Sequence, residues 1–229
     1  MDRAICPNCG QDGEGATCGS CGSSLVLEDR FRLDTELGVR VSASSLSAEL
    51  TGFVNRVSDY IYLRPFGSGG GAFDSLQVVQ GDARLVGVEG RVAYRAMPAL
   101  TLQLSGDWVR GQNLTSDVPL TFVPPPRLVY GVRLEPPARA GAASAPYLMV
   151  SAESNARQTR LDPRDVGPPG YTLVTVGGGV SRLTRRGVVT LDLTLRNALD
   201  AEYRSFMSRY KEFALAAGRA LVVRVSVGR

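Results

Sequence analysis

The sequence predicts an all-β chain of antiparallel strands that follows a small, cysteine-stapled N-terminal unit. Three observations lead to this prediction. From about Leu33 onward, apolar residues recur at every second position rather than every 3.6 positions. The connections between these runs alternate between tight turns and long segments rich in Gly, Pro and Asp. All four cysteines fall within the first 21 residues, so the two parts of the chain differ in kind.

The alternation is clearest in the middle and at the C-terminal end of the chain. Its apolar positions include Val86, Val88, Gly90, Val92, Tyr94 and Ala96, then Leu100, Leu102, Leu104, Gly106 and Trp108, then Leu191, Leu193 and Leu195, and finally Leu221, Val223, Val225 and Val227. We expect nine or ten strands, at residues 36–42, 46–63 (bent near Asn55), 76–81, 84–97, 99–112, 126–135, 146–156, 171–181, 187–197 and 218–228.

The lengths of the connections between predicted strands help to distinguish a transmembrane β-barrel from a soluble β-sandwich. The turns at Met97–Ala99 and Arg185–Gly187 are tight, whereas Pro65–Asp74, Gly111–Pro126 and Gln158–Gly170 are long. Tight turns at one end and long loops at the other are typical of a transmembrane β-barrel. A soluble β-sandwich shows the same two-residue alternation and remains an alternative. Predicted strands of 12 or more residues exceed the usual length of about 5–6 and favour the barrel.

The composition excludes several classes of function. The chain has no histidine, and its only lysine is Lys211. It therefore has no Ser-His-Asp triad, no histidine base and no histidine metal ligand. It also has no cysteine beyond residue 21 and no glycine-rich loop leading from a strand into a helix. We expect no enzymatic activity.

The N-terminal cysteines form two Cys-x-x-Cys pairs, Cys6 with Cys9 and Cys18 with Cys21. Two such knuckles offer four thiolates to one ion, the tetrahedral set that structural zinc prefers. Iron in the same cage, paired disulfides and a redox pair are the alternatives. The unit resembles short bacterial zinc-ribbon domains. We expect a zinc ribbon over residues 1–24, with structural zinc as the cofactor, and a linker over residues 25–35.

The net charge of +4 is the sum of two unlike parts. Residues 1–40 hold four basic and seven acidic residues, whereas residues 41–229 hold 22 and 15, so the net charges are −3 and +7. The acidic balance of the first part argues against a nucleic-acid partner.

Residues 36–229 resemble the C-terminal part of the barrel of TonB-dependent outer-membrane receptors. The resemblance rests on Leu46–Ile61, which ends in Asp-Tyr-Ile, on Gly87–Tyr94 ("G-x-E-x-x-x-x-Y") followed by Pro98, on Pro119-Leu and Pro124–Arg127, on Gly170-Tyr-Thr-Leu173, on Asn197–Tyr203 ("N-L-F-D-x-x-Y"), and on Gly218-Arg219. Together these motifs run in the order of the family across most of the chain.

The resemblance implies nine or ten strands of a larger transmembrane β-barrel, part of a receptor for scarce ligands such as siderophore–metal chelates. It implies contact with outer-membrane lipid and the barrel-assembly machinery, and with the TonB complex only through other parts of the receptor. The motif residues Asn197, Asp200, Tyr203, Gly218 and Arg219 are expected to be structural, with Asn197 and Asp200 bonding backbone amides in a turn. The resemblance leaves the substrate-binding residues unknown.

Aromatic and charged residues of the strands also lead to expectations. We expect an interfacial girdle, with rings in lipid and polar tips among the headgroups, from Tyr60, Tyr62, Tyr94, Trp108, Tyr130 and Tyr203. We expect six charged residues to face the barrel lumen or neighbouring strands, namely Glu89, Arg91, Arg95, Asp107, Asp192 and Arg196.

The chain departs from the family pattern in ways that bear on location and activity. A family barrel has 22 strands and a plug, more than 229 residues can hold. We find no signal-peptide pattern at the start, and the final strand lacks the terminal aromatic usual in the family. We expect a displaced receptor fragment that does not transport alone and that lies in the outer membrane. If the ribbon dictates location, we expect instead a cytoplasmic zinc-ribbon interaction module fused to a β-rich remnant.

Overall fold

The structure is a computed structural model that describes residues 4–5, 12–13, 20, 31–66, 75–136, 144–185 and 187–228. Within these residues all regular structure is β, as predicted. Two short strands, β1 (Ala4–Ile5) and β2 (Asp12–Gly13), pair with each other in antiparallel orientation. The main strands are β3 (Phe31–Ser42), β4 (Leu46–Phe66), β5 (Ser75–Met97), β6 (Leu100–Asn113), β7 (Val118–Pro119), β8 (Arg127–Leu134), β9 (Ser144–Asn155), β10 (Tyr171–Thr184), β11 (Gly187–Arg196) and β12 (Ala220–Gly228).

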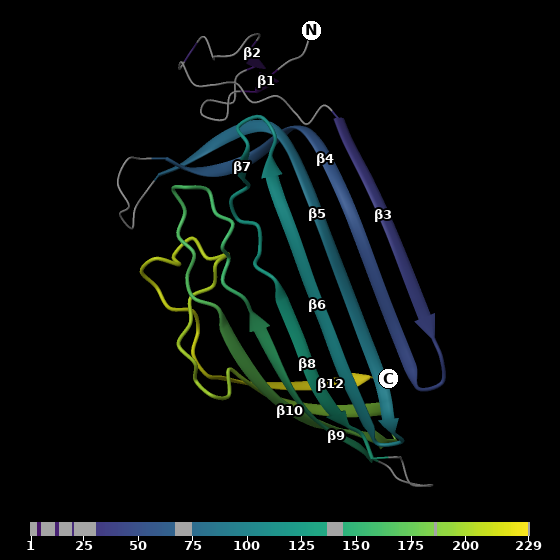
Figure 1. The fold of residues 1–229 in the computed structure, drawn as a ribbon. Coiled ribbons are helices and arrows are strands. Elements are labelled where there is room, and N and C mark those ends of the chain that lie inside the picture. The colour runs from purple at the N-terminus through teal and green to yellow at the C-terminus, as the bar shows by residue number, and fades with distance from the viewer. Residues whose placement is uncertain are drawn as a thin grey trace.

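These strands form one antiparallel meander (Figure 1). Each strand pairs with the next in the order β3-β4-β5-β6-β8-β9-β10-β11-β12, while the short β7 pairs with β6 beside this path. Among the described strands, β3 and β12 each have a single neighbour, so the sheet is open. Because nine strands alternate in direction, its two edges run the same way, from the long loops toward the tight turns. Pairing β3 with β12 directly would therefore make a parallel seam.

The largest differences between the observed and the predicted strand bounds are in two places, and β4 and β10 each also extend three residues beyond their predicted ends. β3 begins at Phe31, so residues 31–35, predicted to be linker, lie in a strand. The predicted strands 76–81 and 84–97 are one strand of 23 residues. Gly81-Asp82 reads as a turn in sequence, but the carboxylate of Asp82 accepts the backbone N–H of Asp59 on β4 at 3.2 Å. The ladder therefore continues through this pair and bends instead of breaking.

The two faces of the sheet differ in polarity. The outer face is apolar: the register aligns Gly52, Val88 and Trp108 in one row, and Leu50, Gly90, Gly106 and Leu128 in the next. Its large side chains are exposed on every long strand. The residues that alternate with these apolar ones along each strand face the inner side, and they include Arg40, Glu49 and Arg91. An exposed apolar face backed by a polar one is the reverse of a soluble sandwich, whose sheets bury their apolar faces against each other.

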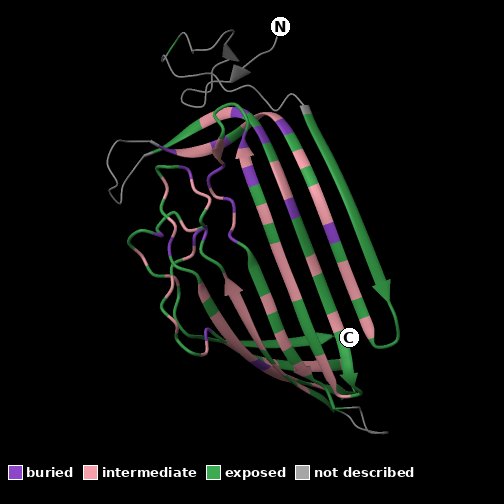
Figure 2. Cartoon of the chain, viewed as in Figure 1, coloured by how far each residue is buried: buried purple, intermediate pink, exposed green. Residues whose placement is uncertain are grey.

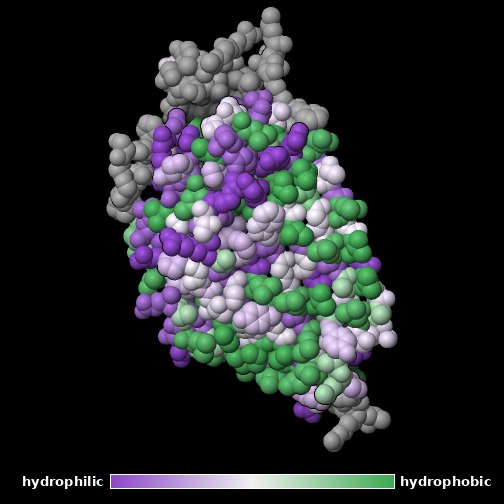
Figure 3. Space-filling model, viewed as in Figure 1, coloured by the Kyte–Doolittle hydropathy of each residue, from purple (hydrophilic) through white to green (hydrophobic). Residues whose placement is uncertain are grey.

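Three tight connections lie at one end of the strands and the longest connections lie at the other, as predicted, but the nine-residue connection 135–143 also lies at the end of the tight turns. The connections at residues 43–45, 98–99 and 185–186 are two or three residues long. Those at residues 67–74, 114–126, 156–170 and 197–219 lie at the other end, which we call the loop end. Figure 3 shows hydrophilic side chains around the loop end, and hydrophobic ones toward the tight turns and along the β3–β4 edge.

Buried residues gather at the loop end (Figure 2). The core there consists of Tyr62, Ala83, Leu120 and Val123. Gly111 lies beneath it, and a Cβ at that position would lie 2.7 Å from the Val123 side chain. Only glycine lets loop 114–126 fold this closely onto the inner face of β6. In the part of the chain that the structure describes, no helical segment has the length and hydropathy needed to cross a bilayer.

Candidate functional site

The candidate site is the loop end, where β4 and β5 meet the loops 114–126, 156–170 and 197–219. Its geometry begins with a β-bulge in β4. Val57 pairs with Ala83, whereas Tyr60 pairs with Gly81, so β4 holds one extra residue at Ser58–Asp59. Asp59 adopts φ 59° there. One extra residue moves every later side chain to the opposite face, and this brings Tyr60, Tyr62 and Arg64 to the inner face.

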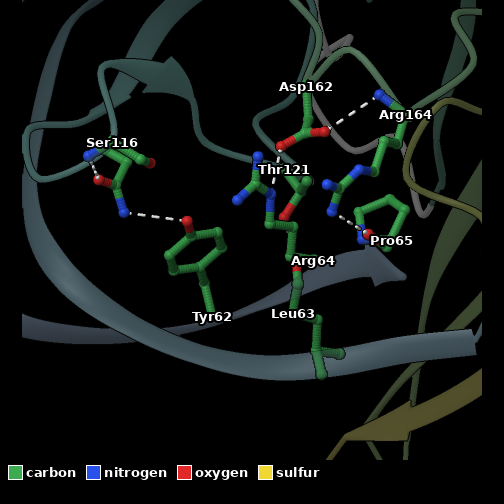
Figure 4. A network of polar contacts seen from close by, with 9 residues as sticks. Tyr62, Leu63, Arg64, Pro65, Ser116, Thr121, Asp162 and Arg164 are labelled. Carbon is green, nitrogen blue, oxygen red and sulfur yellow. Dashed lines mark hydrogen bonds and ion pairs between the residues drawn. The ribbon is translucent and has the colours of Figure 1, made fainter. Parts of the chain in front are cut away.

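Tyr62 anchors loop 114–126. The amide of Asn113 donates to the Tyr62 hydroxyl at 2.9 Å. The side-chain oxygen Oδ1 of Asn113 in turn accepts a hydrogen bond from the backbone N–H of Ser116 at 2.7 Å. The Thr121 hydroxyl donates to the carbonyl of Leu63 (Figure 4). These bonds hold the loop against the bulged part of β4.

Asp162 anchors loop 156–170. Its side chain is fully buried. The carboxylate accepts one hydrogen bond from Nε of Arg64 at 2.8 Å and another from the backbone N–H of Arg164 at 3.0 Å (Figure 4). The guanidinium of Arg164 also donates to the carbonyl of Pro65 at 3.5 Å. A buried carboxylate is costly without such partners, so this pairing determines how the loop meets β4.

Lys211 connects loop 197–219 to the other two loops. Its Nζ lies 2.6 Å from Oδ1 of Asp165, and both side chains are buried. The ammonium also lies 3.9 Å from the ring centroid of Phe206 and 5.3 Å from that of Phe122. A desolvated cation over aromatic rings is stabilised by their quadrupoles. Loops 114–126, 156–170 and 197–219 therefore each contact another of these loops or β4.

The inner face below the loop end carries paired charges. Glu49 accepts hydrogen bonds from Arg40 and Arg91, each with one contact at 2.9 Å. Asp107 accepts Nε of Arg127 at 2.8 Å. A pocket on this face is lined by Glu49, Thr51, Glu89, Arg91, Ser105, Asp107 and Arg127. The six charged residues expected to face the lumen or neighbouring strands all lie on this face by register, including Asp192 and Arg196 on β11.

The five motif residues meet at the base of loop 197–219. Asn197 exchanges two hydrogen bonds of 2.9 Å with the backbone of Ala201 and adopts φ 46°. The Asp200 carboxylate accepts the backbone N–H of Arg219 at 2.9 Å. A Cβ on Gly218 would lie 3.1 Å from that carboxylate. The ring of Tyr203 packs on that of Tyr171, with centroids 4.4 Å apart. The motif thus closes the base of the loop between β11 and β12.

The aromatic residues expected to form a girdle divide into two sets. Tyr94, Trp108 and Tyr130 are exposed on the outer face. Tyr62 is buried on the inner face, where it stacks with Tyr60, and Tyr203 packs against Tyr171. The expectation is wrong for Tyr60 and Tyr62 because the bulge reverses the alternation that placed them outward.

Some residues of the site were not anticipated, and others lie outside the described structure. Arg64, Asp162, Asp165 and Lys211 were missed; the only available signal was a single lysine in a chain of arginines. The proposed zinc ligands Cys6, Cys9, Cys18 and Cys21 lie outside the described residues, so the zinc site stays a prediction. Among the residues that are described, no three His, Cys, Asp or Glu side chains are grouped to hold a metal.

An antiparallel meander with an apolar outer face, a polar inner face and braced long loops at one end defines a segment of a membrane β-barrel protein. A family model described as "TonB dependent receptor-like, beta-barrel" matches residues 34–198. This match covers more than two thirds of the chain, so the chain belongs to the TonB-dependent receptor β-barrel family. The comparison with curated proteins found no significant match.

Three solved structures of similar fold belong to proteins named for copper or a ferric chelate. The copper transporter OprC superposes with a TM-score of 0.71 at 21% identity, over 85% of this chain and 30% of OprC. BauA, the ferric preacinetobactin receptor from Acinetobacter baumannii, gives 0.66 at 17%, over 98% and 32%. The unliganded ferric citrate transporter FecA gives 0.59 at 19%, over 86% and 31%. At these identities the likeness establishes the fold, and the chain spans about a third of each protein.

Proposed function

We propose that residues 36–229 form part of the wall and the loop end of an outer-membrane receptor that takes up scarce ligands such as siderophore–metal chelates. The observation that carries the proposal is the two-faced sheet. Its apolar outer face is exposed on every long strand, whereas its inner face carries paired arginines and carboxylates. Lipid is the environment that stabilises such an outer face.

The ligand class rests on the loop end. The three proteins of similar fold are named for copper, ferric preacinetobactin and ferric citrate. In this chain the loop end presents arginines, including Arg157 and Arg160, which line one pocket with Val123 and Gln158. Guanidinium groups suit the carboxylates of an anionic metal chelate. Binding, not covalent chemistry, is the role that we assign to this site.

The partners follow from the same proposal. Outer-membrane lipid contacts the outer face, and the barrel-assembly machinery inserts the strands. The TonB complex acts through other parts of a receptor, because this segment corresponds to about a third of the proteins that it resembles. The segment on its own supplies wall and loops and does not transport.

Insertion into lipid tests this proposal. The full chain, refolded in the presence of lipid vesicles, is expected to float with the vesicles after an alkaline wash and to migrate differently on gels before and after boiling. Fractionation of expressing cells with a secretion signal added then tests for outer-membrane material. A chain that remains a soluble monomer in both experiments would contradict the proposal.

A second role is proposed for the N-terminal segment, on the basis of its cysteine spacing. Residues 1–24 form a zinc ribbon in which Cys6, Cys9, Cys18 and Cys21 hold one structural zinc, and residues 25–30 join this ribbon to β3 of the receptor portion. Under this alternative the chain is a cytoplasmic protein-interaction module. Metal analysis of the full chain should return about one zinc per chain, lost on Cys6→Ser with Cys9→Ser; metal retained by that variant would refute the ribbon.

A further inference from the structure

Two arginines face each other across neighbouring strands of the outer face. Arg56 on β4 is the direct register partner of Arg84 on β5. Side chains paired in this way have Cβ atoms about 5 Å apart, and like charges at that separation destabilise a sheet. Arg110 on β6 is diagonal to Arg84, because Arg84 pairs with Gln112, two residues further along that strand. Three guanidinium groups thus lie on one patch, which we call the arginine cluster.

The depth of the cluster is set by the apolar residues beneath it. Along β5 the outward positions Tyr94, Val92, Gly90, Val88 and Val86 carry no charge, and the next one toward the loop end is Arg84. Five outward positions span about 27 Å along a strand, close to the apolar band of about 25 Å in outer-membrane barrels. The cluster therefore lies where hydrocarbon gives way to lipid headgroups.

Within the described residues, no carboxylate pairs with Arg56, Arg84 or Arg110, and all three are exposed. The next outward residue of β5 is Asp82, and its carboxylate accepts a hydrogen bond from the backbone N–H of Asp59. On β9 and β10, the outward polar residues Ser154 and Thr172 are uncharged and bond to each other. Gln112, the register partner of Arg84, donates to Asp117 at 2.9 Å and accepts a hydrogen bond from Arg160 at 2.5 Å, so one loop carboxylate and one loop guanidinium lie beside the three strand arginines.

An apolar groove opens directly below the cluster. Gly90 and Gly106 are register partners and leave no side chain between the flanking residues. The groove is lined by Leu50, Val88, Val92, Leu104, Trp108 and Leu128. Its Trp108 is two residues from Arg110 on the same face. A basic patch and an apolar groove thus lie end to end along the direction in which a lipid stands in a bilayer.

We propose that Arg56, Arg84 and Arg110 bind the phosphate of an anionic membrane lipid whose acyl chain occupies the Gly90–Gly106 groove. This inference rests on the proposed membrane location. The phosphate offsets the repulsion between Arg56 and Arg84, which have no ion pair within the described residues, and it accepts charge-assisted hydrogen bonds from all three guanidinium groups. Charge complementarity selects the headgroup, and the groove orients the chain.

Lipid discrimination by the full chain tests the proposal. The refolded protein is placed in mixed micelles with phosphatidylglycerol or with phosphatidylcholine of identical acyl chains, and retained lipid is measured by native mass spectrometry. A basic residue near an anionic headgroup contributes about a fivefold gain in affinity. The triple variant Arg56→Gln, Arg84→Gln, Arg110→Gln should therefore lose phosphatidylglycerol on the order of a hundredfold, with phosphatidylcholine unchanged.

Matched variants distinguish lipid binding by the arginine cluster from binding that depends only on the total positive charge. Arg182→Gln removes an exposed arginine of the same face at the tight-turn end, and it should leave retention unchanged. The triple lysine variant keeps the charge and should keep most of the binding, even if the glutamine variant folds poorly. Inorganic phosphate should compete weakly, because it lacks the chain that fills the groove; full competition would show an adventitious anion site and overturn the proposal.

The two proposals fail in different ways. A wild-type chain that enters phosphatidylcholine vesicles but binds both lipids equally leaves the receptor proposal standing and refutes the lipid site. A chain that enters no vesicle refutes the receptor proposal, and the lipid site with it. Equal loss in the Arg182→Gln and triple variants would also refute the site, because binding would then follow total charge instead of the cluster.

Discussion

The loop end and the tight-turn end use the same charged residue types in opposite environments. At the loop end, Asp162 has a side chain with no exposed surface and pairs with Arg64, and the Lys211–Asp165 pair is 6–7% exposed. Toward the tight turns, Arg40 is 68% exposed in its pair with Glu49, and Glu135 is 55% exposed in its pair with Arg133. Buried pairs are costly to break, whereas exposed pairs contribute little. The stability of the loop end therefore depends on its ion pairs, whereas the stability of the strands toward the tight turns does not.

Deletion of Asp59 should have the largest effect on this comparison. Removing the extra residue restores strict alternation and moves Tyr60, Tyr62 and Arg64 to the outer face. The loop end then loses the Tyr62–Asn113 bond, the Arg64–Asp162 pair and part of its core together, which should cost more than about 4 kcal/mol. Limited proteolysis should cut loops 114–126 and 156–170 rapidly, while the wall keeps its heat-modifiable migration.

Asp59→Gly is the matched control for that deletion. It keeps the chain length and both backbone hydrogen bonds of residue 59, and it relieves the φ of 59°. Stability should therefore stay within about 1 kcal/mol of wild type. If the deletion and the glycine variant give the same proteolysis pattern, the bulge does not position the loops.

The bulge also shows where sequence reasoning succeeds and where it ends. Alternation of apolar residues predicted the faces of β5, β6, β11 and β12, because successive side chains of a strand point to opposite faces of the sheet. Near Ser58–Asp59 the local pattern contains no mark of an extra residue, so Tyr62 was placed on the wrong face. Arg64 and Asp162 lie 98 positions apart, and no local pattern encodes which loop carboxylate meets which strand arginine.

Asp162→Ala should have the next largest effect. It leaves Arg64, which is 24% exposed, without its partner and the Arg164 backbone N–H without an acceptor, and unsatisfied groups of this kind cost about 1–3 kcal/mol. Urea unfolding of the refolded chain in micelles, with hydrogen exchange at loop 156–170, measures this loss. Arg40→Ala removes an exposed guanidinium that pairs with Glu49 near the tight turn 43–45 and should change stability by less than about 1 kcal/mol. Equal effects of the two variants would remove the distinction between the ends.

The Lys211–Asp165 pair sharpens the comparison further. Lys211→Met and Asp165→Leu each leave one buried charge unpaired, whereas the double variant leaves none. The double variant should therefore be more stable than the sum of the single losses predicts, with a coupling of about 0.5–3 kcal/mol. The same urea experiment on all four proteins measures the coupling. Strictly additive losses would show that the 2.6 Å contact does not join the two loops energetically.

Glu135 should show the smallest effect, and its sign is defined. The hydrogen bond from Arg133 holds the pKa of Glu135 below its ordinary value, against a smaller opposing effect of burial. The stabilisation is therefore present above the ordinary carboxyl pKa and is lost as the pH falls through the lowered value. Because Glu135 is more than half exposed, solvent screening should keep the loss below about 0.5 kcal/mol. Comparing wild type with Glu135→Gln in urea at pH 7 and near pH 3 measures it. A large acid-dependent loss at this residue would mean that the tight-turn end depends on ion pairs as the loop end does.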